Sequence, residues 1–213
     1  MDIVFEILSR LISQKNGAVT DSMMDKGIIY KVSYGVALHT IKRIAGEYAP
    51  DHELARQLYE RDEREAKLAA IFIEDPKAVS TNQLELWAND FSNTELAEVA
   101  CSQLLYKTPY ALPYSYQWCQ SPHNHLQRAG WIMVAKAQPK PSQLARYLSL
   151  VETSKSIAPS VQPHIIQALV KLAGSNNDLY EQVTKVLPFL REGSQAQKVV
   201  AKEISAFLAL KVE

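Results

Sequence analysis

Two carboxylates, Glu95 and Glu98, stand near the start of a segment that reads "FSNTELAEVAC" (residues 91–101). Side chains three positions apart lie on one face of a helix, so both acids could meet a substrate together. They could instead stabilise the helix, because Ser92 or Asn93 is a good N-cap and acids in a first turn interact favourably with the helix dipole. We expect Glu95 to serve the helix in this way, and Glu98 to be the candidate for substrate contact.

A second group with potential chemistry is formed by Cys119, His123 and His125 in "CQSPHNH". Thiolate and imidazole are zinc ligands, but this spacing matches no standard zinc pattern and no second cysteine pair stands nearby in the sequence. A turn at Ser121-Pro122 explains the stretch. Glycine-rich phosphate loops and nucleophile-elbow motifs are absent from the sequence as well. We therefore expect no metal and no cofactor.

The composition is that of an ordinary globular protein. A chain of 213 residues can bury one sizeable core, so we expect a single domain over residues 1–213. Its two cysteines, Cys101 and Cys119, indicate reduced thiols rather than a disulfide framework. Asp2 and Glu6 stand where a signal peptide carries positive charge, and no apolar run reaches the roughly 18 residues of a membrane span. We expect a cytoplasmic protein without membrane contact.

Charge is distributed unevenly, although the chain as a whole is neutral. Up to His125 there are 12 basic and 17 acidic residues, whereas from Leu126 onward there are 11 basic and 6 acidic residues. A basic second half permits contact with an anionic partner. The alternative is that the two halves have differently charged solvated surfaces, and charge asymmetry alone does not decide between these interpretations.

Apolar residues recur at spacings of three and four along most of the chain, a pattern typical of amphipathic helices. Stop signals such as Asp75-Pro76 and Gly174-Ser175 separate the segments, and alternating strand-like runs are essentially absent from the sequence. We predict an all-α fold of about a dozen helices, arranged as a bundle or as the stacked pairs of a HEAT-like solenoid. The segments predicted to be helical are 3–12, 36–48, 53–61, 63–75, 81–91, the segment around Glu95, 114–120, 125–137, 141–154, 162–174, 179–190 and 194–210.

Four stretches carry motifs that follow one another in a recognisable order. They are "YGVALHTIKRIAGEY" (34–48), "LYERDEREAKLAAIFI" (58–73), "WANDFSNTELAEVAC" (87–101) and "HLQRAGWIMVAKAQ" (125–138). Together they resemble the DNA alkylation repair family, the HEAT-like-repeat DNA glycosylases that excise alkylated purines. The resemblance extends over most of the chain from about Tyr34. It implies an α-α superhelix of HEAT-like repeats whose concave face binds double-stranded DNA.

The resemblance also implies a mechanism, which uses a carboxylate, two tryptophans and an arginine. Loss of a cationic alkylated purine builds positive charge on the deoxyribose, which a carboxylate and aromatic faces stabilise, while an arginine binds phosphate. In this sequence the carboxylate falls on Glu98 and the arginine on Arg128. The two tryptophans fall on Thr94 and Gln167. The charged groups are therefore kept in chemical type, and both aromatic rings are replaced.

Our leading hypothesis is a member of this family that binds duplex DNA without the aromatic faces that glycosylase chemistry uses. The residues expected to contact DNA are Arg128, Thr94, Gln167 and Trp131. Trp131 is included because it follows Arg128 by three positions and so shares its helix face. As the more ordinary alternative, it is a core residue.

Two further hypotheses remain open. In one, the enzyme persists, with Glu98 in place of the usual aspartate and with Trp87 or Trp131 standing in for the missing rings. In the other, the chain is a non-catalytic protein-interaction scaffold, because helical solenoids present concave faces to protein partners. The near-neutral overall charge favours the scaffold, since DNA-binding proteins commonly carry a basic excess.

Overall fold

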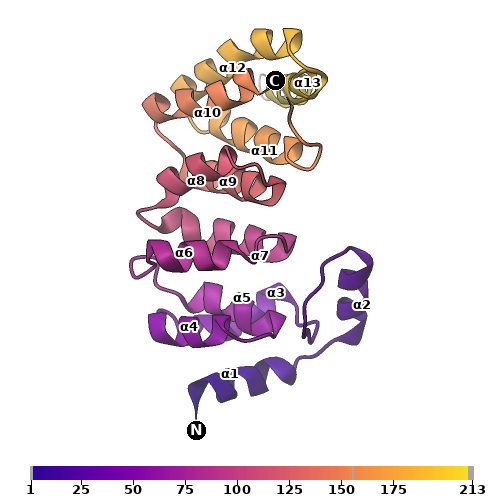
Figure 1. Cartoon of the computed structure of the whole chain (residues 1–213), viewed down its shortest axis with the longest axis vertical. Coiled ribbons are helices and arrows are strands. Elements are labelled where there is room, and N and C mark those ends of the chain that lie inside the picture. The colour runs from indigo at the N-terminus through magenta and orange to yellow at the C-terminus, as the bar shows by residue number, and fades with distance from the viewer. Residues whose placement is uncertain (1, 155, 211–213) are drawn as a thin grey trace. The chain divides into compact units, whose positions relative to one another are not determined.

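The computed structural model describes residues 2–154 and 156–210, and regular structure in them is helical (Figure 1). Across these residues the only strand-like pairing is an isolated bridge between Val32 and Glu63. The predicted all-α class is therefore confirmed. The α-helices are α1 (Ile3–Ile12), α2 (Gly17–Asp25), α3 (Leu38–Gly46), α4 (His52–Tyr59), α5 (Arg64–Ile73), α6 (Thr81–Ala88), α7 (Thr94–Val99), α8 (Ala111–Cys119), α9 (Asn124–Ala137), α10 (Pro141–Thr153), α11 (Gln162–Ala173), α12 (Asn177–Glu192) and α13 (Gln195–Ala209). The π-helix η1 (Ala100–Leu104) and the 3-10 helix η2 (Leu105–Lys107) follow α7.

The helices form two compact units, which we call unit 1 (Met1–Pro109) and unit 2 (Tyr110–Glu213). In unit 2 the helices pack in two layers (Figure 1). Helix α10 packs between α8 and α12, and α11 packs between α9 and α13. The pairs α8–α9 and α12–α13 join the layers around an apolar core that includes Tyr147, Leu169 and Ile204. Helices α9, α11 and α13 form the second of these layers, and each of them therefore keeps one face outside this core.

Unit 1 is built around α5, which is buried along almost its whole length. Helices α3, α4 and α7 all pack against α5. Alanines at positions 66, 69 and 70 let these neighbours approach closely. Helix α6 joins α4 through Trp87, whose ring stacks on that of Tyr59 with centroids 3.9 Å apart. Unit 1 thus has its own core, separate from the residues that form the core of unit 2.

The predicted helical segments correspond to helices of the structure, and the stop signals agree with the observed ends. Helix α5 ends at Ile73, just before Asp75-Pro76, and α11 ends at Ala173, just before Gly174. Helix α2 was not predicted, because Met23 is its one buried residue and an apolar period is therefore lacking. Within the described ranges, no helix has the length and apolar character needed to cross a membrane.

The closest approach of α8 and α9 occurs at Gly130. A Cβ atom at this position would lie 2.8 Å from the backbone nitrogen of Cys119 and 2.8 Å from the backbone oxygen of Ser115. Backbone atoms of a packed helix cannot move aside cheaply, so a side chain here forces α8 and α9 apart. Gly46, near the end of α3, has nothing within 4 Å of the corresponding point.

We predict that Gly130→Ala lowers the free energy of unfolding by about 1–3 kcal/mol, although alanine is the better helix former. Gly46→Ala is the matched control and should be neutral or slightly stabilising, because it gains helix propensity without a clash. Urea denaturation of the two variants measures the difference. Equal stability of both variants would contradict the packing described for α8 and α9.

Candidate functional site

Helix α7 carries two of the residues that the sequence singled out, Thr94 and Glu98. Both are exposed, and their spacing of four places them one turn apart on the same face of the helix. Directly after α7 the chain enters the π-helix η1, a distortion often found near functional sites. Helix α7 therefore presents a carboxylate to solvent, and the residue one turn away from that carboxylate is a threonine rather than an aromatic residue.

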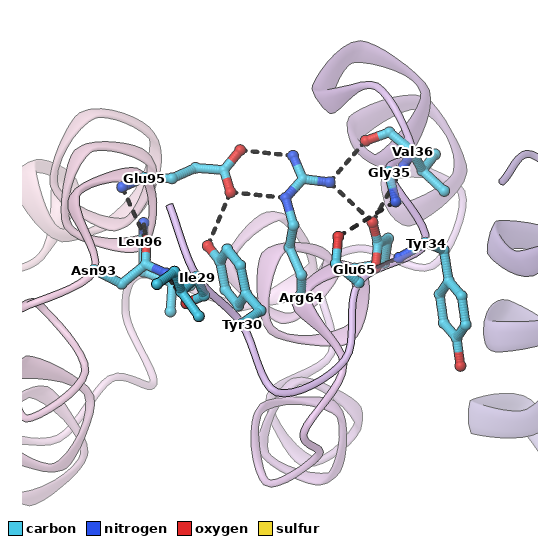
Figure 2. Close-up of polar contacts among 11 residues, drawn as sticks. Ile29, Tyr30, Tyr34, Gly35, Val36, Arg64, Glu65, Asn93, Glu95 and Leu96 are labelled. Atoms are coloured by element: carbon cyan, nitrogen blue, oxygen red, sulfur yellow. Dashed lines mark hydrogen bonds and ion pairs between the residues drawn. The ribbon is translucent and has the colours of Figure 1, made fainter. Parts of the chain in front are cut away.

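A buried arginine, Arg64 of α5, anchors the first turn of α7. Its Nε donates to Glu95 Oε2 at 2.7 Å and its Nη2 donates to Glu95 Oε1 at 2.6 Å (Figure 2). The Arg64 side chain is only 3% exposed, so these two parallel bonds form in a largely water-free environment. Bidentate pairing of this kind fixes direction as well as distance, and it sets α7 in place against α5.

A non-helical segment, residues 28–36, crosses this ion pair and is here called the strap. The Tyr30 hydroxyl donates to Glu95 Oε2 at 2.9 Å, and Asn93 Nδ2 donates to the carbonyl of Ile29 at 3.1 Å (Figure 2). Burial, together with the negative charge of Glu95, raises the pKa of Tyr30 far above its ordinary value. The hydroxyl therefore stays protonated and remains a donor, so the start of the strap is tied to α7.

The second half of the strap is held by Glu65, which is fully buried. Its carboxylate accepts the backbone N–H groups of Tyr34 and Val36, each at 3.1 Å. It also accepts Arg64 Nη1 at 2.9 Å, and the same nitrogen donates to the carbonyl of Val36 at 2.8 Å (Figure 2). One guanidinium thus connects α5, α7 and both halves of the strap.

The structure confirms part of the prediction for the start of α7 and corrects another part. Asn93 is the N-cap, and its Oδ1 accepts the N–H groups of Glu95 and Leu96 at 3.1 and 3.3 Å. Glu95 stands in the first turn as expected, but its side chain binds Arg64 and Tyr30 instead of serving as a cap. A buried cation requires a compensating charge, and that requirement outweighs the gain from capping.

The three tryptophans of the chain, which include Trp87 and Trp131 considered above as aromatic contacts, lie inside the two units. Trp87 is 2% exposed and stacks on Tyr59. Trp131 is also 2% exposed and meets Tyr147 edge-on, with centroids 6.2 Å apart. Trp118 is buried against Tyr114. Since these rings face the cores, they do not form a surface on which a sugar or base could stack.

Arg128 is half-buried at the start of α9 in unit 2. Two histidines stand near it, and the rings of His123 and His125 stack with centroids 5.4 Å apart. Burial lowers the pKa of His125, and the neighbouring His123 and Arg128 lower it further. None of the described residues forms an ion pair with Arg128, so its charge is available to an anion.

No group of three His, Cys, Asp or Glu side chains in residues 2–154 and 156–210 could hold a metal ion, and Cys119 is buried.

Two lysines that the sequence interpretation did not single out extend this basic surface. Lys136 follows Arg128 by eight positions and so lies on the same side of α9, about 12 Å further along the helix. Lys171 of α11 is close enough to Lys136 that the two charges repel. Burial and this repulsion lower the pKa of Lys171. The described part of the chain offers neither lysine a carboxylate within ion-pair distance. The sequence indicated a basic second half, but it did not indicate that α11 brings Lys171 close to Lys136 of α9.

Gln167 is exposed on α11, one turn before Lys171. Both line a cleft of about 980 Å³ in unit 2. The structure therefore brings together Arg128 with Lys136 on α9, and Gln167 with Lys171 on α11, whereas Thr94 and Glu98 belong to unit 1. The two units also differ in net charge, because unit 1 contains 17 acidic and 12 basic residues and unit 2 contains 6 acidic and 11 basic residues.

Comparisons with known proteins bear on this arrangement. A family model described as "DNA alkylation repair enzyme" matches residues 7–172. A solved structure, described as belonging to "a new family of proteins related to the HEAT-like repeat DNA glycosylases with affinity for branched DNA structures", is similar with a TM-score of 0.77 and 21% sequence identity. The similarity covers 97% of this chain and 95% of that one. A search of curated proteins finds no match. The expected HEAT-like helical fold is thus confirmed.

We predict that Glu65→Gln lowers the free energy of unfolding by about 3 kcal/mol, because it removes one partner of a buried charge. Amide hydrogen exchange should accelerate at Tyr34 and Val36, whose N–H groups donate to Glu65. Glu98→Gln is the matched control at an exposed position and should change stability by no more than about 0.5 kcal/mol. Chemical denaturation and hydrogen-exchange mass spectrometry measure the two effects. Unchanged exchange in the strap would show that Glu65 does not hold it.

Proposed function

Because the chain belongs to the DNA alkylation repair enzyme family, we propose that it is a DNA-binding protein that prefers branched DNA and does not excise alkylated bases. The observation that carries this proposal is the basic surface on α9 and α11, formed by Arg128, Lys136 and Lys171. None of these three has an ion-pair partner among the described residues. Unpaired cations on one surface, two of which repel each other, favour an anion, and a nucleic acid backbone supplies anions at regular spacing.

The preference for branched DNA is supported by the relative of similar fold, whose description gives it affinity for branched DNA structures. The chemistry of the basic surface agrees with this choice. Arginine and lysine contacts to phosphate are independent of sequence, so they suit a ligand that is recognised by its shape. Gln167, exposed beside Lys171, adds an amide that can donate and accept hydrogen bonds.

The absence of excision is supported by the surroundings of Glu98. A glycosylase of this type needs aromatic faces next to its carboxylate, to hold a sugar that becomes positively charged. Thr94 and Gln167 occupy the two positions where the resemblance places tryptophan, and both are exposed side chains without a ring. The buried rings of Trp87 and Trp131 do not replace them. Glu98 alone can offer only a solvent-screened charge.

We predict that the wild-type chain releases no 7-methylguanine or 3-methyladenine from alkylated duplex DNA. The physical reason is the lack of an aromatic surface around Glu98. Chromatography of the released bases measures this, with heat-depurinated DNA as the positive control. Robust release that Glu98→Gln abolishes would mean that the carboxylate is sufficient, and that our proposal wrongly excludes catalysis.

We predict that DNA binding weakens steeply as salt rises, because binding releases counterions from the phosphates. Arg128→Ala and Lys171→Ala should each reduce affinity about tenfold and lower the salt slope by about one. Lys185→Ala is the matched control, since Lys185 is an exposed lysine of unit 2 on α12 that pairs with Glu181. Its affinity for DNA should equal that of the wild type.

Fluorescence anisotropy at two salt concentrations, with a four-way junction and a duplex of the same arms, measures these effects. Tighter binding of the junction supports the proposed ligand, and equal binding of both DNAs would limit the proposal to duplex. If the wild type binds neither DNA at low salt, the DNA proposal fails and the protein-scaffold hypothesis takes its place.

A further inference from the structure

The cleft on α11 is large and mostly apolar. Its volume of about 980 Å³ is within the range of sites that bury a small organic molecule. Ile166 and Val170 supply aliphatic surface from α11, and Phe207 reaches the cleft from α13. The Phe207 side chain is 51% exposed, so much of its surface is open to solvent. An exposed ring on the wall of a cleft offers a stacking surface, which a single exposed apolar residue on a convex surface does not.

Two of the polar groups that line the cleft are side-chain amides. Gln167 enters it from α11, and Gln138 enters it from the end of α9. Glu203 of α13 adds a carboxylate, which accepts hydrogen bonds from amino groups. Amides that donate and accept side by side, together with a carboxylate, match the edge of a nucleobase.

The backbone at Gln138 gives a separate indication that its side chain is used. Its φ of 49° places it in the left-handed region, and within the described residues it is the one non-glycine residue with positive φ. Helices that end in this way usually place glycine there, and a following proline such as Pro139 disfavours the conformation of the residue before it further. A glutamine at such a strained position, lining the cleft, indicates a function for its side chain.

Two lysines at the cleft favour an anionic ligand over an apolar one. Lys171 lines the cleft, and Lys136 is close enough to repel it. An apolar peptide would leave these two cations without a partner, whereas a nucleotide brings a phosphate to them. Helix α13 lies beyond residue 172, where the match to the family model ends, so Phe207 and Glu203 are additions to the part of the chain that the family model describes.

We propose that this cleft receives one unpaired nucleotide of a branched DNA. The base stacks on Phe207, and its edge meets the amides of Gln138 and Gln167. The phosphate of the same nucleotide binds Lys171. This inference rests on the proposed function, because branched DNAs such as flaps and bulged junctions carry unpaired bases at the branch point, and it adds a site for the base to a surface that otherwise contacts phosphates.

The test uses the full chain and two four-way junctions that differ at one position. The first junction carries one unpaired adenine at its branch point, and the second carries an abasic residue there, which keeps the phosphate and removes the base. We expect the wild type to bind the first junction more tightly. Phe207→Ala should weaken binding to it by roughly 5- to 100-fold, the range of base–aromatic stacking, and should leave binding to the abasic junction unchanged.

Phe189→Ala is the matched control, because Phe189 is an exposed phenylalanine of unit 2 on α12 and lies outside the cleft. It should bind both junctions as the wild type does. Phe207→Tyr keeps a ring and should retain the preference, whereas Phe207→Leu keeps apolar volume without a ring and should lose it. Gln138→Gly should keep or raise the melting temperature while reducing the preference, because glycine adopts positive φ without strain.

A spectroscopic readout locates the base directly. With 2-aminopurine at the unpaired position, binding should lower its fluorescence through stacking, and Phe207→Ala should restore the signal. If the wild type binds both junctions equally, or if Phe207→Ala and Phe189→Ala have the same effect, the nucleotide site is wrong while DNA binding stands. Absence of binding to any junction at low salt would overturn the proposed function and this inference together.

Discussion

Unit 1 is organised around one buried charge, the guanidinium of Arg64. An arginine cannot lose its proton in a protein, so burying it requires carboxylates and carbonyls placed on its donors. Glu65 stands next to it in sequence, and Glu95 comes from a helix 31 residues later. Because the partners of this one cation belong to α5, α7 and the strap, satisfying it fixes all three elements at once. The direction in which Thr94 and Glu98 point follows from that fixed position of α7.

In unit 2 the constraint that matters for the proposed function is the opposite one, because the cations on α9 and α11 have no ion-pair partner among the described residues. Two layers of helices bury the apolar side chains, and the remaining face of α9 and α11 carries Arg128, Lys136 and Lys171 without carboxylates in ion-pair distance among the described residues. Packing holds these charges in place, since each stands on a helix whose other side belongs to the core. The repulsion between Lys136 and Lys171 costs stability, and an anionic ligand would remove that cost. The two units thus differ in charge balance, with 17 acidic against 12 basic residues in unit 1 and 6 acidic against 11 basic residues in unit 2.

The features that could be predicted from the sequence are those that depend on residues close to one another along the chain. Apolar spacing revealed every helix with a buried stripe, and it missed α2, in which only Met23 is buried. The role of Glu95 was not accessible, because an acid in a first turn has the same local pattern whether it caps the helix or binds a distant Arg64. The cleft was equally hidden, since Gln138 and Phe207 belong to different helices and only the fold brings them to one cavity. The family resemblance supplied positions such as Arg128, but not the groups that surround them.

The positions where the family resemblance places aromatic rings, and the position where the chain offers an exposed ring, are chemically related in the function we propose. By the family resemblance, Thr94 and Gln167 stand where rings would face a cationic sugar, and in the function we propose Glu98 therefore has no such sugar to stabilise. Phe207, on the helix beyond the family match, offers a ring that needs no carboxylate beside it, because a neutral base stacks on any aromatic face. In the function we propose, Arg128 binds phosphate in the same way whether a base is excised or only bound, because a phosphate contact does not depend on the base. In the function we propose, the helical scaffold therefore holds a base through an exposed ring on α13 and does not act on it.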